Sequence, residues 1–290
     1  MESFLVIRRF RPTVIIGTGG FASFPPLLWG ILLGIPTVAC EVNVVPGLVS
    51  RWLAPRVDLV LVAYPGTALL LRANRIRVTG VPLRPELLEA AALPREGIRA
   101  DLGLDPRKRM VLVLGGSRGA APLNRAITYS KADHDGLQVL LVTGREMGRA
   151  TRRANGGIVM REYLDQCEMG KALAAADLVI SRAGAATLAE LTALGRPAIL
   201  VPWPGAAENH QELNARFLEQ TGGAVVFQEH LLGEINLVGL AGRLLDERER
   251  LNRMAARSRA AGRRDGLKRV IEEVERLLKT YTSSGSAGRE

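Results

Sequence analysis

Three glycines interrupt an apolar run at residues 111–124, "VLVLGGSRGAAPLN", and a possible helix follows them. A buried strand that ends in a glycine turn before a helix can cradle an anion, because the first helical amides have no partners within the helix. Dinucleotide enzymes have the spacing G-x-G-x-x-G and an acidic residue about 20 positions later. Here Gly115, Gly116 and Gly119 are spaced G-G-x-x-G, and a polar loop, "SKADHDGLQ", lies at that distance. The sequence favours another anion over a dinucleotide, which stays an alternative.

A second strand, glycine turn and helix start occur at residues 181–191, "SRAGAATLAEL". Glu190 would lie about one and a half turns into this helix. A carboxylate just behind a phosphate site can accept hydrogen bonds from both hydroxyls of a ribose. The alternative is that Glu190 is an ordinary exposed glutamate on a helix.

Polar residues gather after the next predicted strand, in "PWPGAAENHQELNAR" at residues 202–216. Amide and imidazole groups at the carboxyl end of a strand can recognise sugar hydroxyls. A solvated loop that caps a helix would have the same composition. The candidates are Glu208, Asn209, His210, Gln211 and Asn214.

Short β-branched segments and helical patterns alternate along the whole chain. The segments are apolar on both faces, which is typical of parallel strands covered by helices. Two consecutive arrays predict an α/β protein with two doubly wound, Rossmann-like domains. The predicted strands are 13–17, 36–40, 59–63, 75–80, 110–116, 137–144, 157–164, 178–184, 197–203 and 223–227.

The domain boundaries follow from the same pattern. We predict an N-terminal domain over 1–84, a proline-rich and charged linker over 85–109, and a C-terminal domain over 110–262. One apolar helix face predicts a C-terminal helix over 263–280 that returns to the first domain, followed by a disordered tail over 281–290. The face consists of Leu267, Val270, Ile271, Val274, Leu277 and Leu278.

The first array is short by about one strand–helix–strand unit, since it opens directly on the strand that leads to "GTGG". A doubly wound domain normally begins with its own glycine turn after the first strand. We therefore expect that turn to lie upstream of Met1.

Composition limits the function classes. Only two cysteines occur, Cys40 and Cys167, and the three histidines are scattered, so neither a disulfide framework nor a metal site is expected. A net charge of +10 calls for an acidic partner. Nucleic acid is not favoured, because aromatic residues make up only 4% of the chain and no recognition motif is present.

The apolar segment at residues 21–36, "FASFPPLLWGILLGIP", is shorter than the roughly 20 residues that a membrane span needs. Core packing explains most of it. Arg8, Arg9 and Arg11 lie nearby, so its exposed side can also contact an anionic membrane surface.

Six segments occur in order along nearly the whole chain: "IIGTGGFASFPP", "GIPTVACEVNVVPGLVSRWLA", "VTGVPLRPEL", "LGGSRGAAPLN", "REYLDQCEMGKALAAADLVISRAGAATLAEL" and "GRPAILVPWPGAAENHQELNA". Together they resemble the MurG family of bacterial glycosyltransferases. The resemblance implies a GT-B fold of two Rossmann-like domains, with the donor in the cleft between them. It also implies transfer of N-acetylglucosamine from UDP-N-acetylglucosamine to the lipid-linked acceptor lipid I, without metal or cofactor. The product would be lipid II for peptidoglycan, made at the cytoplasmic face of the plasma membrane.

The resemblance also implies a role for particular residues. Ser117 and Arg84 would contact the donor, and the backbone of Leu164 would hold the uracil. Gln211 would bind the N-acetylglucosamine, and Asn43 would reach it from the N-terminal domain. The phosphates and ribose would face the turn formed by Ala185, Ala186, Thr187, Leu188, Ala189 and Glu190, with Glu190 on the ribose diol.

The chain departs from the family at its beginning. The family starts with a strand and a "GGTGGH" loop, which this chain lacks, and its His-Glu-Gln-Asn is here "CEVN" at 40–43. Arg118 replaces a common glutamine. The general base is therefore unknown, and Glu41 is the one nearby carboxylate considered for it. Three hypotheses follow: an active lipid-linked glycosyltransferase, a UDP-sugar-binding fragment that is inactive without its N-terminal segment, and a nicotinamide oxidoreductase.

Overall fold

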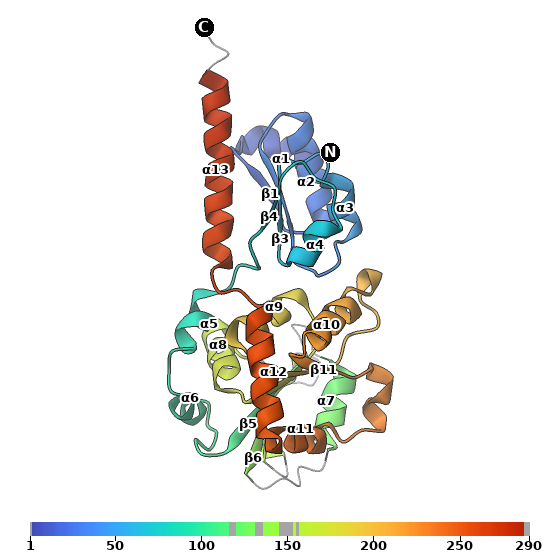
Figure 1. The fold of residues 1–290 in the computed structure, drawn as a ribbon, viewed down its shortest axis with the longest axis vertical. Coiled ribbons are helices and arrows are strands. Elements are labelled where there is room, and N and C mark those ends of the chain that lie inside the picture. The colour runs from blue at the N-terminus through green and yellow to red at the C-terminus, as the bar shows by residue number, and fades with distance from the viewer. Residues whose placement is uncertain (1, 116–119, 131–135, 145–152, 155–156, 287–290) are drawn as a thin grey trace. The chain divides into compact units, whose positions relative to one another are not determined.

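A computed structural model of the chain describes residues 2–115, 120–130, 136–144, 153–154 and 157–286. These residues form two compact units, shown in Figure 1. Unit 1 consists of Met1–Pro82 and Asp265–Glu290, and unit 2 consists of Leu83–Arg264. The chain therefore passes from one unit to the other twice, at residues 82–83 and 264–265.

Unit 1 is built on a parallel sheet in the order β1-β2-β3-β4. The strands are β1 (Ile15–Gly17), β2 (Thr37–Glu41), β3 (Leu59–Val62) and β4 (Ile76–Val78). Helices α1 (Glu2–Phe10), α2 (Phe24–Leu32) and α3 (Leu48–Leu53) cover one face, where Ile7, Leu27 and Leu53 join the core. The short elements η1 (Phe21–Ser23) and α4 (Pro65–Leu69) complete the connections.

Helix α13 (Gly266–Ser286) covers the other face of this sheet, as Figure 1 shows. Leu277 is buried against β2 and β3, and Val270 and Val274 pack beside it. Leu267 and Ile271 keep 43% and 49% of their surface exposed, so the apolar face predicted from the sequence is only partly covered within the described residues.

The predicted disordered tail over 281–290 is wrong for the part that the structure describes, because α13 continues to Ser286. Tyr281 donates a hydrogen bond from its hydroxyl to Asp58, which fixes the helix against the sheet of unit 1. Thr282 also donates to the Lys279 carbonyl oxygen at 3.0 Å. The contact with Asp58 gives the last turns tertiary support that composition alone did not suggest.

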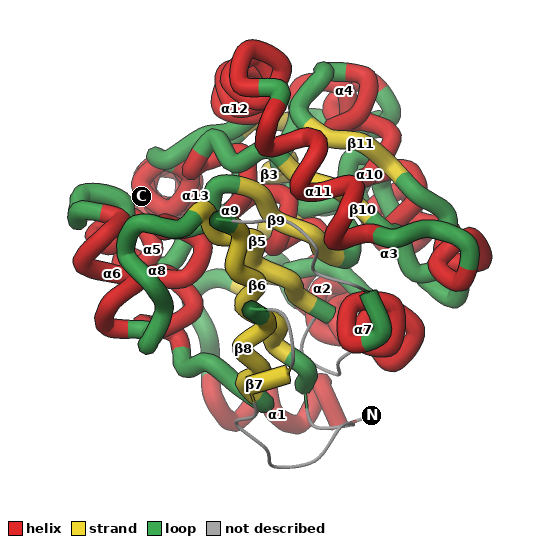
Figure 2. The backbone as a smooth tube through the Cα atoms, turned by 90° about the horizontal axis from the view of Figure 1, so that it is seen from below, coloured by secondary structure: helices red, strands yellow, loops and turns green. Residues whose placement is uncertain are grey.

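Unit 2 contains a larger sheet in the order β11-β10-β9-β5-β6-β8-β7, visible as the row of strands in Figure 2. All neighbours are parallel except β7 and β8. The first strand of this sheet along the chain, β5, lies in its middle. The chain then adds β6, β8 and β7 on one side and β9, β10 and β11 on the other, so the strand order reverses between β5 and β9. The strands are β5 (Arg109–Leu114), β6 (Leu137–Val142), β7 (Arg153–Ala154), β8 (Ile158–Arg161), β9 (Leu178–Ser181), β10 (Ala198–Leu200) and β11 (Ala224–Val226).

Helices cover both faces of the unit 2 sheet. Leu123 and Ile127 of α7 (Ala121–Thr128) share one core with the strands, with α11 (Leu237–Asp246) and with η4 (Glu229–Gly233). The remaining elements are α5 (Pro85–Ala90), α6 (Arg95–Asp101), α8 (Gln166–Ala175), α9 (Ala185–Leu194), η3 (Ala207–Asn209), α10 (His210–Gln220) and α12 (Arg248–Ala261).

Two parallel α/β units confirm the predicted fold class, and each predicted strand coincides with an observed one. The short antiparallel β7 was not predicted. The segment 85–109, which was predicted to be a linker, instead forms α5 and α6 inside unit 2. Leu87 and Ile98 on these helices are buried, so this proline-rich segment is part of a folded core.

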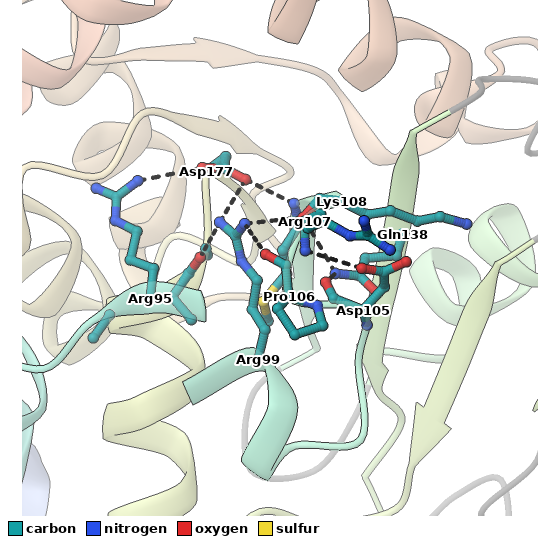
Figure 3. Close-up of polar contacts among 12 residues, drawn as sticks. Arg95, Arg99, Asp105, Pro106, Arg107, Lys108, Gln138 and Asp177 are labelled. Atoms are coloured by element: carbon teal, nitrogen blue, oxygen red, sulfur yellow. Dashed lines mark hydrogen bonds and ion pairs between the residues drawn. The ribbon is translucent and has the colours of Figure 1, made fainter. Parts of the chain in front are cut away.

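A polar network at the amino ends of the unit 2 strands is shown in Figure 3. Asp177, just before β9, accepts hydrogen bonds from Arg95 at 3.2 Å, from Arg99 at 2.9 Å and from the Met110 amide at 2.7 Å. Gln138 of β6 pairs with the backbone of Asp105, accepting from its amide and donating to its carbonyl oxygen. This network joins α6 to the starts of the central strands.

We predict that Asp177→Asn lowers the free energy of unfolding by about 2–4 kcal/mol, because it removes the charge that compensates the buried Arg99. Denaturant unfolding measures the change. Asp101→Asn is the matched control, since Asp101 pairs with Lys171 at the surface, and exposed pairs contribute about 0–1 kcal/mol. Equal effects of the two substitutions would contradict the importance of the network.

Candidate functional site

Helix α9 begins directly after β9, next to the point where the strand order reverses. Its N-cap is Gly184, which offers no side-chain hydrogen bond to the first turn. The first backbone amides of a helix have no partners within it. Among the described residues, the amides of Ala185, Ala186 and Thr187 therefore have no hydrogen-bond partner, and they present N–H donors and the positive end of the helix dipole at the carboxyl edge of the sheet.

Glu190 lies on the second turn of α9 and forms an ion pair with Arg84. The Arg84 Nη2 atom lies 2.6 Å from Glu190 Oε1, and the two side chains are 34% and 15% exposed. Within the described residues no other partner holds the second oxygen, Glu190 Oε2. The carboxylate is thus fixed in place and still able to accept hydrogen bonds behind the free amides.

Leu164 lies in the loop between β8 and α8, and its side chain is buried. Among the described residues, neither its amide nor its carbonyl oxygen has a hydrogen-bond partner. An adjacent backbone donor and acceptor match the N3–H and O4 edge of a uracil ring. The following helix is fixed by a capping box, in which Asp165 accepts from the Glu168 amide at 2.8 Å.

Gln211 lies in the first turn of α10, and its Oε1 atom accepts a hydrogen bond from the Trp203 amide at 3.0 Å. Because the oxygen is engaged, the side chain presents its NH₂ group as a donor. The loop before α10 is strained, since Glu208 and Asn209 have φ angles of 50° and 54°. Such strain often occurs at functional loops.

Other residues of the predicted polar run have supporting contacts. Asn214 is buried and donates to the Ala183 carbonyl oxygen at 3.2 Å, so it holds the turn before α9. His210 bonds through Nδ1 to the Ala207 carbonyl oxygen at 2.6 Å. Asn214 therefore supports the turn before α9, and His210 supports the loop before α10.

Arg182 was not among the residues that the sequence analysis singled out; it lay only within the predicted strand 178–184. It is buried and donates to the carbonyl oxygens of Val201 and Pro202, at 3.1 and 3.3 Å, and it pairs with Glu229. Arg182 thereby joins the carboxyl ends of β9 and β10. The available signal was its position two residues before Gly184.

In unit 1, Glu41 is the last residue of β2, and Asn43 lies two positions after it. Glu41 is buried, and its Oε1 atom accepts from the amide and the Nδ2 of Asn43, at 3.0 and 3.1 Å. Its Oε2 atom accepts from the Gly47 amide at 3.0 Å and the Ser50 hydroxyl at 2.6 Å. A carboxylate with four donors is poorly placed to accept a substrate proton, so the geometry argues against Glu41 as the general base.

Within unit 2, Leu164, residues 185–190 and Gln211 thus follow β8, β9 and β10, and Arg84, the N-cap of α5, pairs with Glu190. Asn43 belongs to unit 1. Ser117 and Arg118 lie outside the described residues. Two parallel α/β units, with helix N-termini, a carboxylate and an amide side chain at the carboxyl edge of a sheet, are the arrangement of nucleotide-sugar enzymes such as the GT-B glycosyltransferases.

Comparisons with known proteins agree with this class. Residues 1–62 match the glycosyltransferase family 28 N-terminal domain, and residues 110–270 match the glycosyltransferase family 28 C-terminal domain. A Desulforamulus reducens protein is 39% identical over 96% of this chain and 77% of its own length, and a Moorella thermoacetica protein is 38% identical over 97% and 78%. Both are named UDP-N-acetylglucosamine--N-acetylmuramyl-(pentapeptide) pyrophosphoryl-undecaprenol N-acetylglucosamine transferase. The chain belongs to this family of transferases, the MurG family.

Solved structures show the same fold. The crystal structure of Acinetobacter baumannii MurG matches with a TM-score of 0.72 and 25% identity, over 95% of this chain and 76% of that one. A UDP-GlcNAc 2-epimerase from Neisseria meningitidis bound to UDP-GlcNAc matches with a TM-score of 0.67 at 12% identity, over 95% of this chain and 79% of that one. At that identity the second match concerns the fold alone.

The thiol of Cys40 is half-buried and lies next to Glu41, so the pH dependence of its alkylation tests how strongly this environment disfavours charge. Burial, and secondarily the charge of Glu41, raises the pKa of Cys40 from 9.0 to about 11. At pH 8 we expect its thiolate fraction, and so its alkylation rate, to be about 100-fold below that of an ordinary thiol. In Cys167→Ser protein the iodoacetamide rate should rise about tenfold per pH unit to near pH 11. A plateau below pH 9 would contradict the raised pKa of Cys40.

Proposed function

We propose that the protein transfers N-acetylglucosamine from UDP-N-acetylglucosamine to lipid I, the undecaprenyl-pyrophosphoryl-N-acetylmuramyl-pentapeptide. The product is lipid II, a precursor of peptidoglycan. The observation that carries the proposal is the free N-terminus of α9 with Glu190 fixed behind it. Membership of the MurG family supports the choice of donor and acceptor.

Each part of the donor has a matching group in unit 2. The uracil edge pairs with the amide and carbonyl oxygen of Leu164, and Glu190 accepts from the ribose hydroxyls. The diphosphate faces the amides of Ala185–Thr187, where the helix dipole favours negative charge. Gln211 donates from its NH₂ group to an oxygen of the N-acetylglucosamine. Ser117 and Asn43 stay predictions from the family resemblance.

The reaction is a direct, inverting displacement. The C4 hydroxyl oxygen of the muramyl sugar attacks the anomeric carbon, its bond to the diphosphate oxygen breaks, and UDP leaves with the electron pair. The α9 amides stabilise the negative charge that grows on the leaving diphosphate. A general base takes the hydroxyl proton. Glu41, with four hydrogen bonds, serves instead to hold Asn43 and the following loop.

Turnover with UDP-N-acetylglucosamine and a lipid I analogue tests the function. We expect lipid II and UDP to form in equal amounts. Tight UDP binding without transfer would favour the alternative of a UDP-sugar-binding fragment that needs a further segment. Absence of both UDP binding and transfer would overturn the proposal, and binding of a nicotinamide cofactor instead would favour an oxidoreductase.

Gln211→Glu tests the sugar contact separately from the nucleotide. A glutamate can still accept from the Trp203 amide but has no N–H to donate. We expect UDP affinity to stay within about twofold, whereas kcat/KM for UDP-N-acetylglucosamine falls about 10- to 100-fold, since hydrogen bonds of this kind contribute about 1–3 kcal/mol. Calorimetry with UDP and initial rates measure the two effects. An equal loss of UDP affinity would place Gln211 at the nucleotide instead.

We also propose that unit 1 binds the cytoplasmic face of the plasma membrane peripherally. No described helix is long and apolar enough to cross a bilayer. Leu5, Val6 and Phe10 on α1 are 60%, 63% and 78% exposed, and Arg8 and Arg9 lie on the same helix. Exposed apolar side chains beside arginines suit an anionic lipid surface, which a lipid-linked acceptor requires the enzyme to approach.

We predict that the protein sediments with vesicles containing phosphatidylglycerol at low salt and is released at high salt. Phe10→Ser should weaken this binding severalfold. Tyr129→Ser is the control, because Tyr129 is 81% exposed but lies in unit 2. Equal binding to neutral vesicles, or an equal effect of the two substitutions, would argue against this surface.

A further inference from the structure

The backbone of Arg84 begins a helix that packs on α8, the helix that follows Leu164. It is the N-cap residue of α5, with Pro85 in the first turn, and its carbonyl oxygen accepts from the Leu87 amide at 3.2 Å. Helix α5 packs closely on α8, since a Cβ atom at Gly170 would lie 3.2 Å from both the Glu86 carbonyl oxygen and the Leu87 Cα atom. Arg84 therefore begins the helix that packs on α8, and α8 follows the loop of Leu164.

The side chain of Arg84 is anchored to a different helix. Its only hydrogen bond among the described residues is the one from Nη2 to Glu190 Oε1 on α9. The Glu190 side chain is only 15% exposed, so its charge has few water molecules around it. Without a partner, such a carboxylate loses both its charge compensation and its fixed rotamer.

We propose that Arg84 is a positioning residue that acts on the donor through Glu190. It links the loop that holds the base to the carboxylate that holds the ribose, and it keeps Oε2 and the remaining lone pair of Oε1 directed at the diol. This inference rests on the proposed function, because it takes UDP as the bound nucleotide. A direct contact of Arg84 with the diphosphate is the competing role, and the two roles differ in which part of the ligand they need.

Calorimetric titration with UDP and with 2′,3′-dideoxy-UDP separates the two roles, since both ligands have the diphosphate and only UDP has the diol. We expect Arg84→Met to weaken UDP binding about tenfold and dideoxy-UDP binding less than about twofold. In a Glu190→Gln background, Arg84→Met should add less than about twofold to the loss for UDP, because the group through which it acts is already changed. Equal losses for the two ligands, additive losses in the double variant, or tighter UDP binding by Arg84→Met would each overturn the inference.

Two further variants keep the test independent of folding. Arg84→Lys retains the charge and a donor toward Glu190, so we expect it to restore most of the difference between the two ligands. Arg95→Met is the matched control: Arg95 also lies at the start of a short helix and pairs with a carboxylate, Asp177, which keeps Arg99 as a partner. It should leave both affinities unchanged. If the wild-type protein does not bind UDP, the proposed function fails; if it binds UDP and Arg84→Met affects both ligands equally, only this inference fails.

Discussion

The first amides of α9 have no hydrogen-bond partners within the helix, and Gly184 at the N-cap gives them none. The rest of unit 2 determines where these donors lie and what surrounds them. Because β9 and β5 are parallel neighbours at the reversal of strand order, the turn after β9 opens at the carboxyl edge of the sheet. Ligands of doubly wound sheets bind at this edge. The position of the proposed donor site thus follows from topology before any side chain is considered.

Buried polar contacts keep this edge rigid. Arg182 holds β9 to the backbone after β10, and Asn214 holds the turn at Ala183. At the opposite edge, Asp177 ties α6 to the start of β5. Since both ends of the central strands are fixed, the free amides and Glu190 are held ready for a ligand, and less ordering has to occur when it binds. In unit 1, Glu41 likewise holds Asn43 in place, by accepting hydrogen bonds from its amide and its side chain.

Much of the fold and part of the site can be predicted from the sequence. Runs such as "VLVL" and "LVIS" are apolar on both faces, which is typical of a covered parallel sheet, and the glycine turns after them predict an anion site. Pairings between distant residues cannot be predicted this way. Arg84 and Glu190 are 106 positions apart, and nothing in either local segment indicates that they meet. The four donors on Glu41 come from a loop whose path the sequence does not fix, so its carboxylate looked available.

The predictions for the segment 85–109 and for the end of α13 were wrong because both segments depend on contacts with distant residues. The segment 85–109 has the prolines and charges of a linker, yet Leu87 and Ile98 become buried once α8 is present to pack against. The end of α13 is likewise supported by Asp58, a residue of unit 1 that lies 223 positions from Tyr281. In both cases tertiary contact outweighs local propensity.

The most direct test of the account is an amide NMR titration of the protein with UDP. If the diphosphate binds the free N-terminus of α9 and the uracil binds Leu164, the amide resonances of Ala185, Ala186, Thr187 and Leu164 will shift together and saturate with one dissociation constant. Amides of Asp177 and Met110, at the other edge of the sheet, will not move. Shifts confined to other segments, or none at all at saturating UDP, would contradict the central claim that these unpaired amides form the nucleotide site.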